Sequence, residues 1–191
     1  MVLPKEGRRY TYKEYLTWDD EIHYELIEGV PYAMAGTRLS HAAVRGELET
    51  ILRTYLRDKK CRVFSETVDV LLSANENDDH DTVVKPDILV VCDPTKLRER
   101  VVVGAPDLIM EVLSRSTSRM DRITKLRLYE NAGVREYWVV DPFNKVVKTY
   151  ILKNKKYGDP ANYEVTDTIR VHIFEDLDIT LEDIFEHVED Y

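Results

Sequence analysis

Short apolar runs constrain this chain more than any other feature of its sequence. Residues 83–91, 108–113 and 136–140 are largely made of large apolar side chains, and turn-forming or polar residues bound each run. Runs of this length are typical of buried strands. They alternate with helical patterns, so the sequence predicts an α/β fold with a mixed sheet.

Periodicity and turn signals predict the remaining elements. Apolar residues recur at helical spacing in residues 40–57, with Ser40 as the expected N-cap, and again in residues 120–131, which Gly133 closes. Residues 62–72 alternate like a half-buried strand, and residues 24–34 predict a hairpin that turns at Glu28 and Gly29. The core order is helix, strand, strand, strand, helix, strand, with an extra N-terminal hairpin and C-terminal strands. Several α/β folds share this order.

Shorter elements complete the prediction. They comprise a helix in 11–16 capped by Thr11, a loop in 73–81, a connector in 93–100, a helix start in 114–119, strands in 145–152 and near 163–165, and a helix in 181–188.

The size and charge of the chain limit its class. With 191 residues, the chain is expected to form a single domain, 1–191. Its net charge is −9, and residues 162–191 carry ten acidic residues and one basic residue, so the preceding 161 residues hold 26 of each sign. A neutral body lacks the basic surface of a typical duplex binder, which argues against tight nonspecific binding to DNA.

The cysteines and the apolar stretches indicate a compartment. Cys61 and Cys92 lie among apolar residues and form no CxxC motif, so the sequence predicts two buried thiols in a reducing, cytoplasmic setting. The N-terminus has no apolar run of signal-peptide length, and no stretch is long enough to span a membrane. No membrane contact is expected.

Two carboxylates interrupt the apolar strands. Asp87 opens the run Ile88–Val91, and Glu111 lies inside the run 108–113. A buried carboxylate is costly unless it is hydrogen-bonded or holds a cation. Asp87 alone could be a strand-end residue bonded to backbone amides, but Glu111 requires a partner. Together the two could bind one Mg²⁺ ion, which prefers hard oxygen ligands and keeps several waters.

Lys125 is the candidate cation beside these carboxylates. It lies on the helix that follows the Glu111 strand, with apolar neighbours on that helix. Such a lysine could stabilise the charge that develops on a phosphate under attack. The alternative is a solvated surface lysine paired with Asp121, which spacing alone leaves open.

Several motifs lie in a fixed order along the chain: YELIEGVPYAMAG, SHAAVRGEL, PDILVV, DLIMEVLS and STSRMDRITKLRLYENAGVREYWVVDP. In this order they resemble the Uma-two family of PD-(D/E)XK nuclease-like proteins over a core of about residues 24–152. The resemblance implies a restriction-endonuclease-like fold in which Asp87, Glu111 and the backbone carbonyl of Val112 hold the metal. The lysine of the motif would fall at Leu113, and the resemblance implies that it has moved to Lys125.

Three second-rank positions are also singled out. His41, near a helix start where the family often has histidine, could touch the metal or a phosphate, or could bond locally. Glu28 in the hairpin turn fits the family pattern as an outer metal ligand or hydrogen-bond partner. Glu47 could orient the lysine or a metal-bound water. Tyr129 is expected in the core.

These residues favour a Mg²⁺- or Mn²⁺-dependent endonuclease that hydrolyses phosphodiester bonds of nucleic acid, with DNA favoured over RNA. A homodimer is expected because duplex cutters of this class usually need two active sites. The first alternative is a catalytically weak or inactive module that binds nucleic acid or protein, as Leu113 and the neutral body suggest. The second is hydrolysis of some other phosphate ester.

Overall fold

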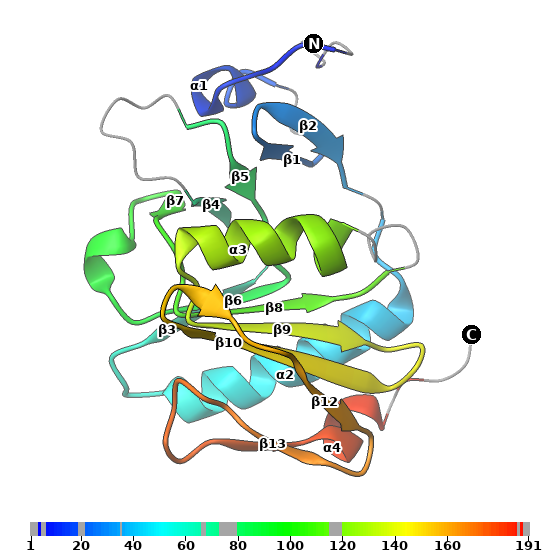
Figure 1. The fold of residues 1–191 in the computed structure, drawn as a ribbon. Helices are drawn as coiled ribbons and strands as arrows, with labels where there is room; N and C mark the ends of the chain where they lie inside the picture. Colours follow the sequence, from blue (N-terminus) through cyan, green and yellow to red (C-terminus); the bar gives the residue numbers. More distant parts are fainter. Residues whose placement is uncertain are drawn as a thin grey trace.

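A large mixed sheet lies between helices, and a smaller sheet that includes the N-terminal hairpin lies beside it (Figure 1). The computed structural model describes residues 4, 7–18, 22–34, 36–65, 68–72, 80–114, 120–186 and 188. The predicted loop residues 73–79 and helix-start residues 115–119 lie outside this range. No described helix combines the length and the apolarity needed to cross a membrane.

The large sheet has the strand order β11-β10-β9-β8-β6-β3, with β12 paired to β10. Its strands are β3 (Arg62–Ser65), β6 (Ile88–Val91), β8 (Leu108–Val112), β9 (Glu136–Asp141), β10 (Val146–Lys153), β11 (Lys156–Tyr157) and β12 (Ala161–Glu164). β8 and β9 are parallel, and the other neighbours are antiparallel. β6, β8 and β9 are buried along their whole length, as their largely apolar sequences predict.

Two helices cover opposite faces of this sheet (Figure 1). α2 (Leu39–Leu56) buries a stripe of Val44, Leu48, Leu52 and Leu56 against one face. α3 (Leu126–Ala132) covers the other face, and Gly133 ends it in the left-handed conformation that glycine favours (φ 91°). The predicted order of helix, strand, strand, strand, helix, strand is confirmed as α2, β3, β6, β8, α3, β9.

The acidic C-terminal segment is part of the core. It forms β13 (Thr168–Arg170), β14 (Asp178–Thr180) and α4 (Leu181–Phe185), two of which, the strands, were not predicted. Its apolar side chains pack with α2 in one cluster that includes Ile169, Val171, Leu177, Ile179, Leu181, Ile184, Phe185 and Val188. The described acidic residues of this segment are exposed on the outside of a packed layer.

The smaller sheet has the order β2-β1-β5-β4-β7. Its strands are β1 (Tyr24–Ile27), β2 (Val30–Ala33), β4 (Asp69–Leu71), β5 (Val83–Val84) and β7 (Val101–Val103), and α1 (Tyr12–Tyr15) lies beside it. The predicted hairpin is confirmed: Glu28 (φ 49°) and Gly29 (φ 80°) turn the chain between β1 and β2. Both central residues are left-handed, so glycine suits the second position.

Two predicted strands are wrong in extent, because each is divided between the two sheets. Residues 62–72 form β3 in the large sheet and β4 in the small one, and residues 83–91 form β5 and β6. Pro86 lies at the second division, where it supplies no N–H group to a ladder. Alternation predicts burial but not which sheet a strand joins. β7, which has three residues, was not predicted.

The helix starts also differ from the prediction. The N-cap of α2 is Arg38 rather than Ser40, and the helix ends at Leu56. Residues 120–131 begin as a π-helical segment, Met120–Lys125, before α3 continues it. Wider turns of this kind are frequent at functional sites.

The prediction of two buried thiols is wrong, because Cys61 and Cys92 form a disulfide. β3 and β6 are antiparallel with Arg62 opposite Val91, so Cys61 lies opposite Cys92 one pair further along, with Cα atoms 4.0 Å apart. The pairing of two strands 31 residues apart creates this contact. The expectation of a reducing compartment rested on free thiols and loses that support.

Candidate active site

Asp87 and Glu111 lie across from each other at one end of the β6–β8 pair. The register pairs Ile88 with Met110, so the next position sets Asp87 opposite Glu111. Asp87 is 8% exposed and Glu111 is 3% exposed. The strand pairing therefore places two buried carboxylates on neighbouring strands, and each needs a polar partner.

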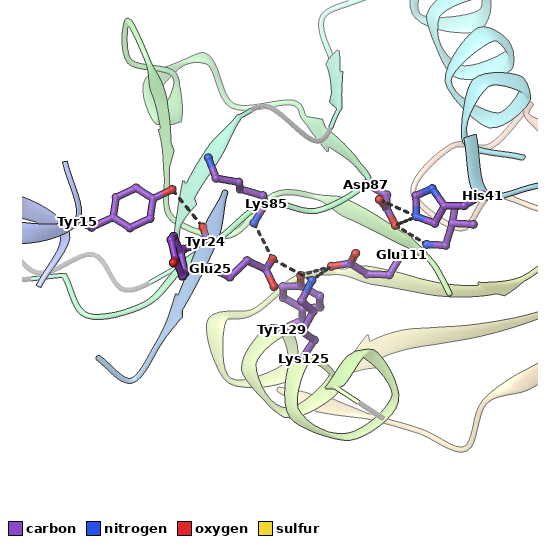
Figure 2. Close-up of polar contacts among 10 residues, drawn as sticks. Tyr15, Tyr24, Glu25, His41, Lys85, Asp87, Glu111, Lys125 and Tyr129 are labelled. Atoms are coloured by element: carbon purple, nitrogen blue, oxygen red, sulfur yellow. Dashed lines mark hydrogen bonds and ion pairs between the residues drawn. The ribbon is translucent and has the colours of Figure 1, made fainter. Parts of the chain in front are cut away.

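Asp87 finds its partners in β8 and α2. Its Oδ2 atom accepts the backbone N–H of Val112 at 2.7 Å, and Nε2 of His41 lies 3.1 Å from Oδ1 and 3.2 Å from Oδ2 (Figure 2). His41 lies in the first turn of α2 and is buried. Within the described part of the chain, its Nδ1 atom has no hydrogen-bond partner. His41 thus reaches the site through Asp87.

Lys125 lies beside Glu111 and is not a surface lysine. Its ammonium is 2.9 Å from Oε1 of Glu111 and 2.9 Å from Oε1 of Glu25, and the residue is 4% exposed. It is the last residue of the π-helical segment and the N-cap of α3, which together carry it over the end of β8. The alternative of a solvated lysine is wrong, because burial requires that its charge be paired.

Glu25 is a site residue that the sequence analysis missed. It lies in β1, is 6% exposed, and accepts the backbone N–H of Lys85 at 2.8 Å in addition to the lysine ammonium (Figure 2). The signal was a carboxylate between Tyr24 and the apolar pair Leu26 and Ile27. The criterion that singled out Glu111, a charge within an apolar strand, would have found it.

Tyr129 does more than fill the core. It is fully buried, as predicted, and its hydroxyl donates a hydrogen bond to Oε1 of Glu111 at 2.5 Å. Burial raises the pKa of Tyr129 well above its ordinary value, and the negative charges of Glu111 and Glu25 add to the effect. The phenol therefore stays protonated and remains a donor to Glu111.

Two of the second-rank residues lie apart from this cluster. Glu28 is exposed in the hairpin turn, where its backbone N–H bonds to Thr82 and its carbonyl oxygen accepts from Arg9. Glu47 is half-buried on α2. Among the described residues, neither carboxylate makes a hydrogen bond or ion pair with Asp87, Glu111 or Lys125.

The donors at this end of the sheet suit a hard cation. Among the described residues, no group of three or more His, Cys, Asp or Glu side chains is gathered for a metal ion. The carboxylates of Asp87 and Glu111 and the carbonyl oxygen of Val112 offer oxygen atoms on adjacent strands. Magnesium accepts such a small set because it keeps several waters of its own.

Comparisons with known proteins find a family, two relatives and a solved structure to which this chain is similar. The model of the Uma2 family, described as "Putative restriction endonuclease", matches residues 12–182. Two Synechocystis relatives, the uncharacterized proteins slr1290 and sll1609, are each 26% identical over 162 and 164 residues, which is 83% of this chain and 83% and 88% of theirs. A crystal structure described as a putative nuclease of DUF820 from Anabaena variabilis has a TM-score of 0.79 at 21% identity, covering 94% of this chain and 99% of that one.

Proposed function

The chain belongs to the Uma2 family, and we propose that it is a Mg²⁺- or Mn²⁺-dependent endonuclease that hydrolyses phosphodiester bonds of nucleic acid. Its fold is restriction-endonuclease-like. The observation that carries the proposal is the meeting of Asp87, Glu111 and Lys125, from three different elements, at one buried end of the large sheet. Fold alone does not determine function, so the proposal rests on this cluster of side chains.

The charge of the cluster supports a cation. Asp87, Glu111 and Glu25 bring three carboxylates and Lys125 brings one ammonium, so among these four residues acidic groups outnumber basic groups by two. Excess negative charge is costly in a buried site. A divalent cation would offset it.

Each residue of the cluster then has a defined role. Asp87, Glu111 and the Val112 carbonyl oxygen would hold the ion, which when bound polarises a phosphate and lowers the pKa of a water. His41 holds the carboxylate of Asp87 in place from the first turn of α2. The Lys125 ammonium, beside Glu111, would stabilise the negative charge on the phosphate during attack.

The substrate and the assembly are also part of the proposal. DNA is proposed over RNA, and a homodimer would supply the second active site that cutting both strands of a duplex requires. The residues before 162 are neutral in sum, so binding would depend on specific contacts and on the metal more than on a basic surface.

Cleavage with matched variants tests the proposal. Wild type should cut mixed DNA or RNA substrates with Mg²⁺ or Mn²⁺ and be silent in EDTA. Asp87→Ala, Glu111→Ala and Lys125→Ala should each lower the rate by about a hundredfold or more, since each removes a group that acts on the reacting phosphate. Glu28→Gln, on the exposed hairpin turn, is the control and should cut like wild type.

Metal binding gives a second measurement. Saturating Mg²⁺ should raise the unfolding midpoint of wild type but not of Asp87→Ala, because only a ligand that binds the folded state stabilises it; at a hundred times Kd the gain is about 2.7 kcal/mol. An equal effect of Mg²⁺ on both proteins would exclude the metal site at Asp87.

One observation favours the binding module as the second candidate. Leu113, at the position of the motif's lysine, is 7% exposed and packs in the cluster on the α3 side of the sheet. No cation can come from that position, so catalysis would depend wholly on Lys125. A folded wild type that binds nucleic acid but cuts none of the substrates with either metal would establish the binding module instead.

A further inference from the structure

We propose that Glu25 is a positioning residue for Lys125: it holds the lysine ammonium in the active site while Glu111 binds the metal. This inference rests on the proposed function. It gives the N-terminal hairpin, which lies outside the helix-strand-strand-strand-helix-strand core, a part in the reaction.

The geometry makes Glu25 an equal partner of Lys125. The ammonium lies 2.9 Å from Oε1 of Glu25 and 2.9 Å from Oε1 of Glu111 (Figure 2). The side chains of Lys125 and Glu25 are 5% and 8% exposed, so water screens this pair little. An ammonium has three donors, and the two carboxylates fix the directions of two of them.

The two carboxylates have different second contacts. Oε1 of Glu111 also accepts the Tyr129 hydroxyl, and Glu111 is the residue that faces Asp87 across the strands. A divalent ion bound by Glu111 would repel the ammonium and weaken that ion pair. Within the described part of the chain, the other contact of Glu25 is the backbone N–H of Lys85, and its partner across the β1–β2 ladder is Tyr32 rather than a carboxylate. Glu25 can therefore keep the ammonium paired when the metal is bound.

Glu25 is itself held in one position by the smaller sheet. It pairs with Tyr32 in the β1–β2 ladder, and the Lys85 N–H donates to the same oxygen that contacts the ammonium, at 2.8 Å. Lys85 is anchored in turn by an ion pair between its side chain and Asp69, which also accepts from the Tyr15 hydroxyl. A carboxylate fixed by backbone pairing suits a positioning role, because a small misplacement of a reacting group is costly.

A metal-free double-mutant cycle tests the pairing without reference to activity. In EDTA, Lys125→Met should lower the unfolding midpoint, because Glu25 and Glu111 lose their buried cation. Glu25→Gln should cost less in the Lys125→Met protein than in wild type, or should raise its midpoint, because the cation it served is gone. Glu28→Gln, on the same hairpin but exposed, should behave additively with Lys125→Met. Additive midpoints for Glu25→Gln and Lys125→Met would overturn the inference.

Kinetics test the positioning role. At saturating Mg²⁺, Glu25→Gln should lower kcat by about tenfold to a hundredfold with little change in KM, and Glu25→Asp, which keeps the charge, should recover part of it. The double variant Glu25→Gln/Lys125→Met should be no slower than Lys125→Met. Wild-type kcat in Glu25→Gln would overturn the inference, and so would loss of Mg²⁺ affinity in that variant, because Glu25 would then be a metal ligand.

The two tests separate two kinds of failure. An inactive wild type would contradict the proposed nuclease, and the cycle in EDTA would still support or overturn the pairing of Glu25 with Lys125. An active wild type with an additive cycle would leave the nuclease standing and remove the role of Glu25.

Discussion

At the scale of single residues, each buried charged group of the site contacts a group from a different element. Lys125 from the end of the π-helical segment meets Glu25 from β1 and Glu111 from β8, while His41 from α2 meets Asp87. These groups are buried, so removal of Lys125 would leave the carboxylates of Glu25 and Glu111 without that cation, which is far more costly than the loss of a surface ion pair.

Tyr129→Phe tests one of these contacts alone. The substitution keeps the ring in the core but removes the hydroxyl that donates to Glu111. Hydrogen bonds to charged groups contribute about 1.5–3 kcal/mol, so the free energy of unfolding should fall by about that amount in urea denaturation. Tyr163→Phe is the control: this partly buried tyrosine of β12 has no described side-chain hydrogen bond and should lose less than about 0.5 kcal/mol. Equal losses would mean that the hydroxyl of Tyr129 contributes nothing specific.

At the scale of elements, one buried carboxylate joins β9 to the C-terminal segment. Glu136, 1% exposed, accepts the indole N–H of Trp138 and the backbone N–H groups of His172 and Ile173. The predicted strand at 136–140 begins with this residue, but nothing in the sequence shows that residues about 35 positions later would donate to it, because the contact depends on how β13 and its loop pack against α2.

Glu136→Ala should destabilise this junction. Three buried donors lose their acceptor, at about 1–3 kcal/mol for each unsatisfied group before relaxation and water entry reduce the sum. Burial raises the pKa of Glu136, against the hydrogen bonds from His172, Trp138 and Ile173, which lower it. The difference in free energy of unfolding between wild type and Glu136→Ala is therefore fully present below the ordinary carboxyl pKa. This difference shrinks as pH rises through the raised pKa.

Urea denaturation between pH 4 and pH 8, together with hydrogen exchange of residues 168–185, measures this effect. Glu182→Ala, an exposed carboxylate of α4, is the matched control and should change neither the free energy of unfolding nor the exchange. A difference in free energy of unfolding between wild type and Glu136→Ala that grows as pH rises would contradict the raised pKa of Glu136.

At the scale of the whole molecule, one covalent link and one packed segment hold distant parts together. The Cys61–Cys92 disulfide joins β3 to β6, the strand that begins beside Asp87, and the C-terminal segment closes over α2. Both links act on the large sheet from the side away from α3. The rigid frame that results holds the site groups of β6, β8 and α2 in place.

Reduction of the disulfide should lower stability without unfolding the sheet. A loop of 31 residues corresponds to about 3–4 kcal/mol on the chain-entropy model. Dithiothreitol should therefore lower the unfolding midpoint of wild type and leave that of Cys61→Ser/Cys92→Ser unchanged. No response of wild type to the reductant would show that the two cysteines are not bonded in solution.

The sequence by itself determined the segments whose burial follows from their own periodicity. The apolar strands β6, β8 and β9, the long helix α2 and the hairpin turn at Glu28 and Gly29 were predicted because each pattern lies within a few consecutive residues. The same logic marked Asp87 and Glu111 as costly charges in apolar strands, and family motifs directed attention to Lys125. Their roles in catalysis stay predictions.

Only the tertiary structure decided which segments meet. The division of 62–72 and 83–91 between two sheets, the Cys61–Cys92 disulfide and the packing of the acidic segment all depend on pairing between distant strands. Glu25 belongs to this group, because its meeting with Lys125 requires the small sheet to lie against the large one. Local patterns report how deeply a residue is buried, whereas its partner is set by topology, which no single segment encodes.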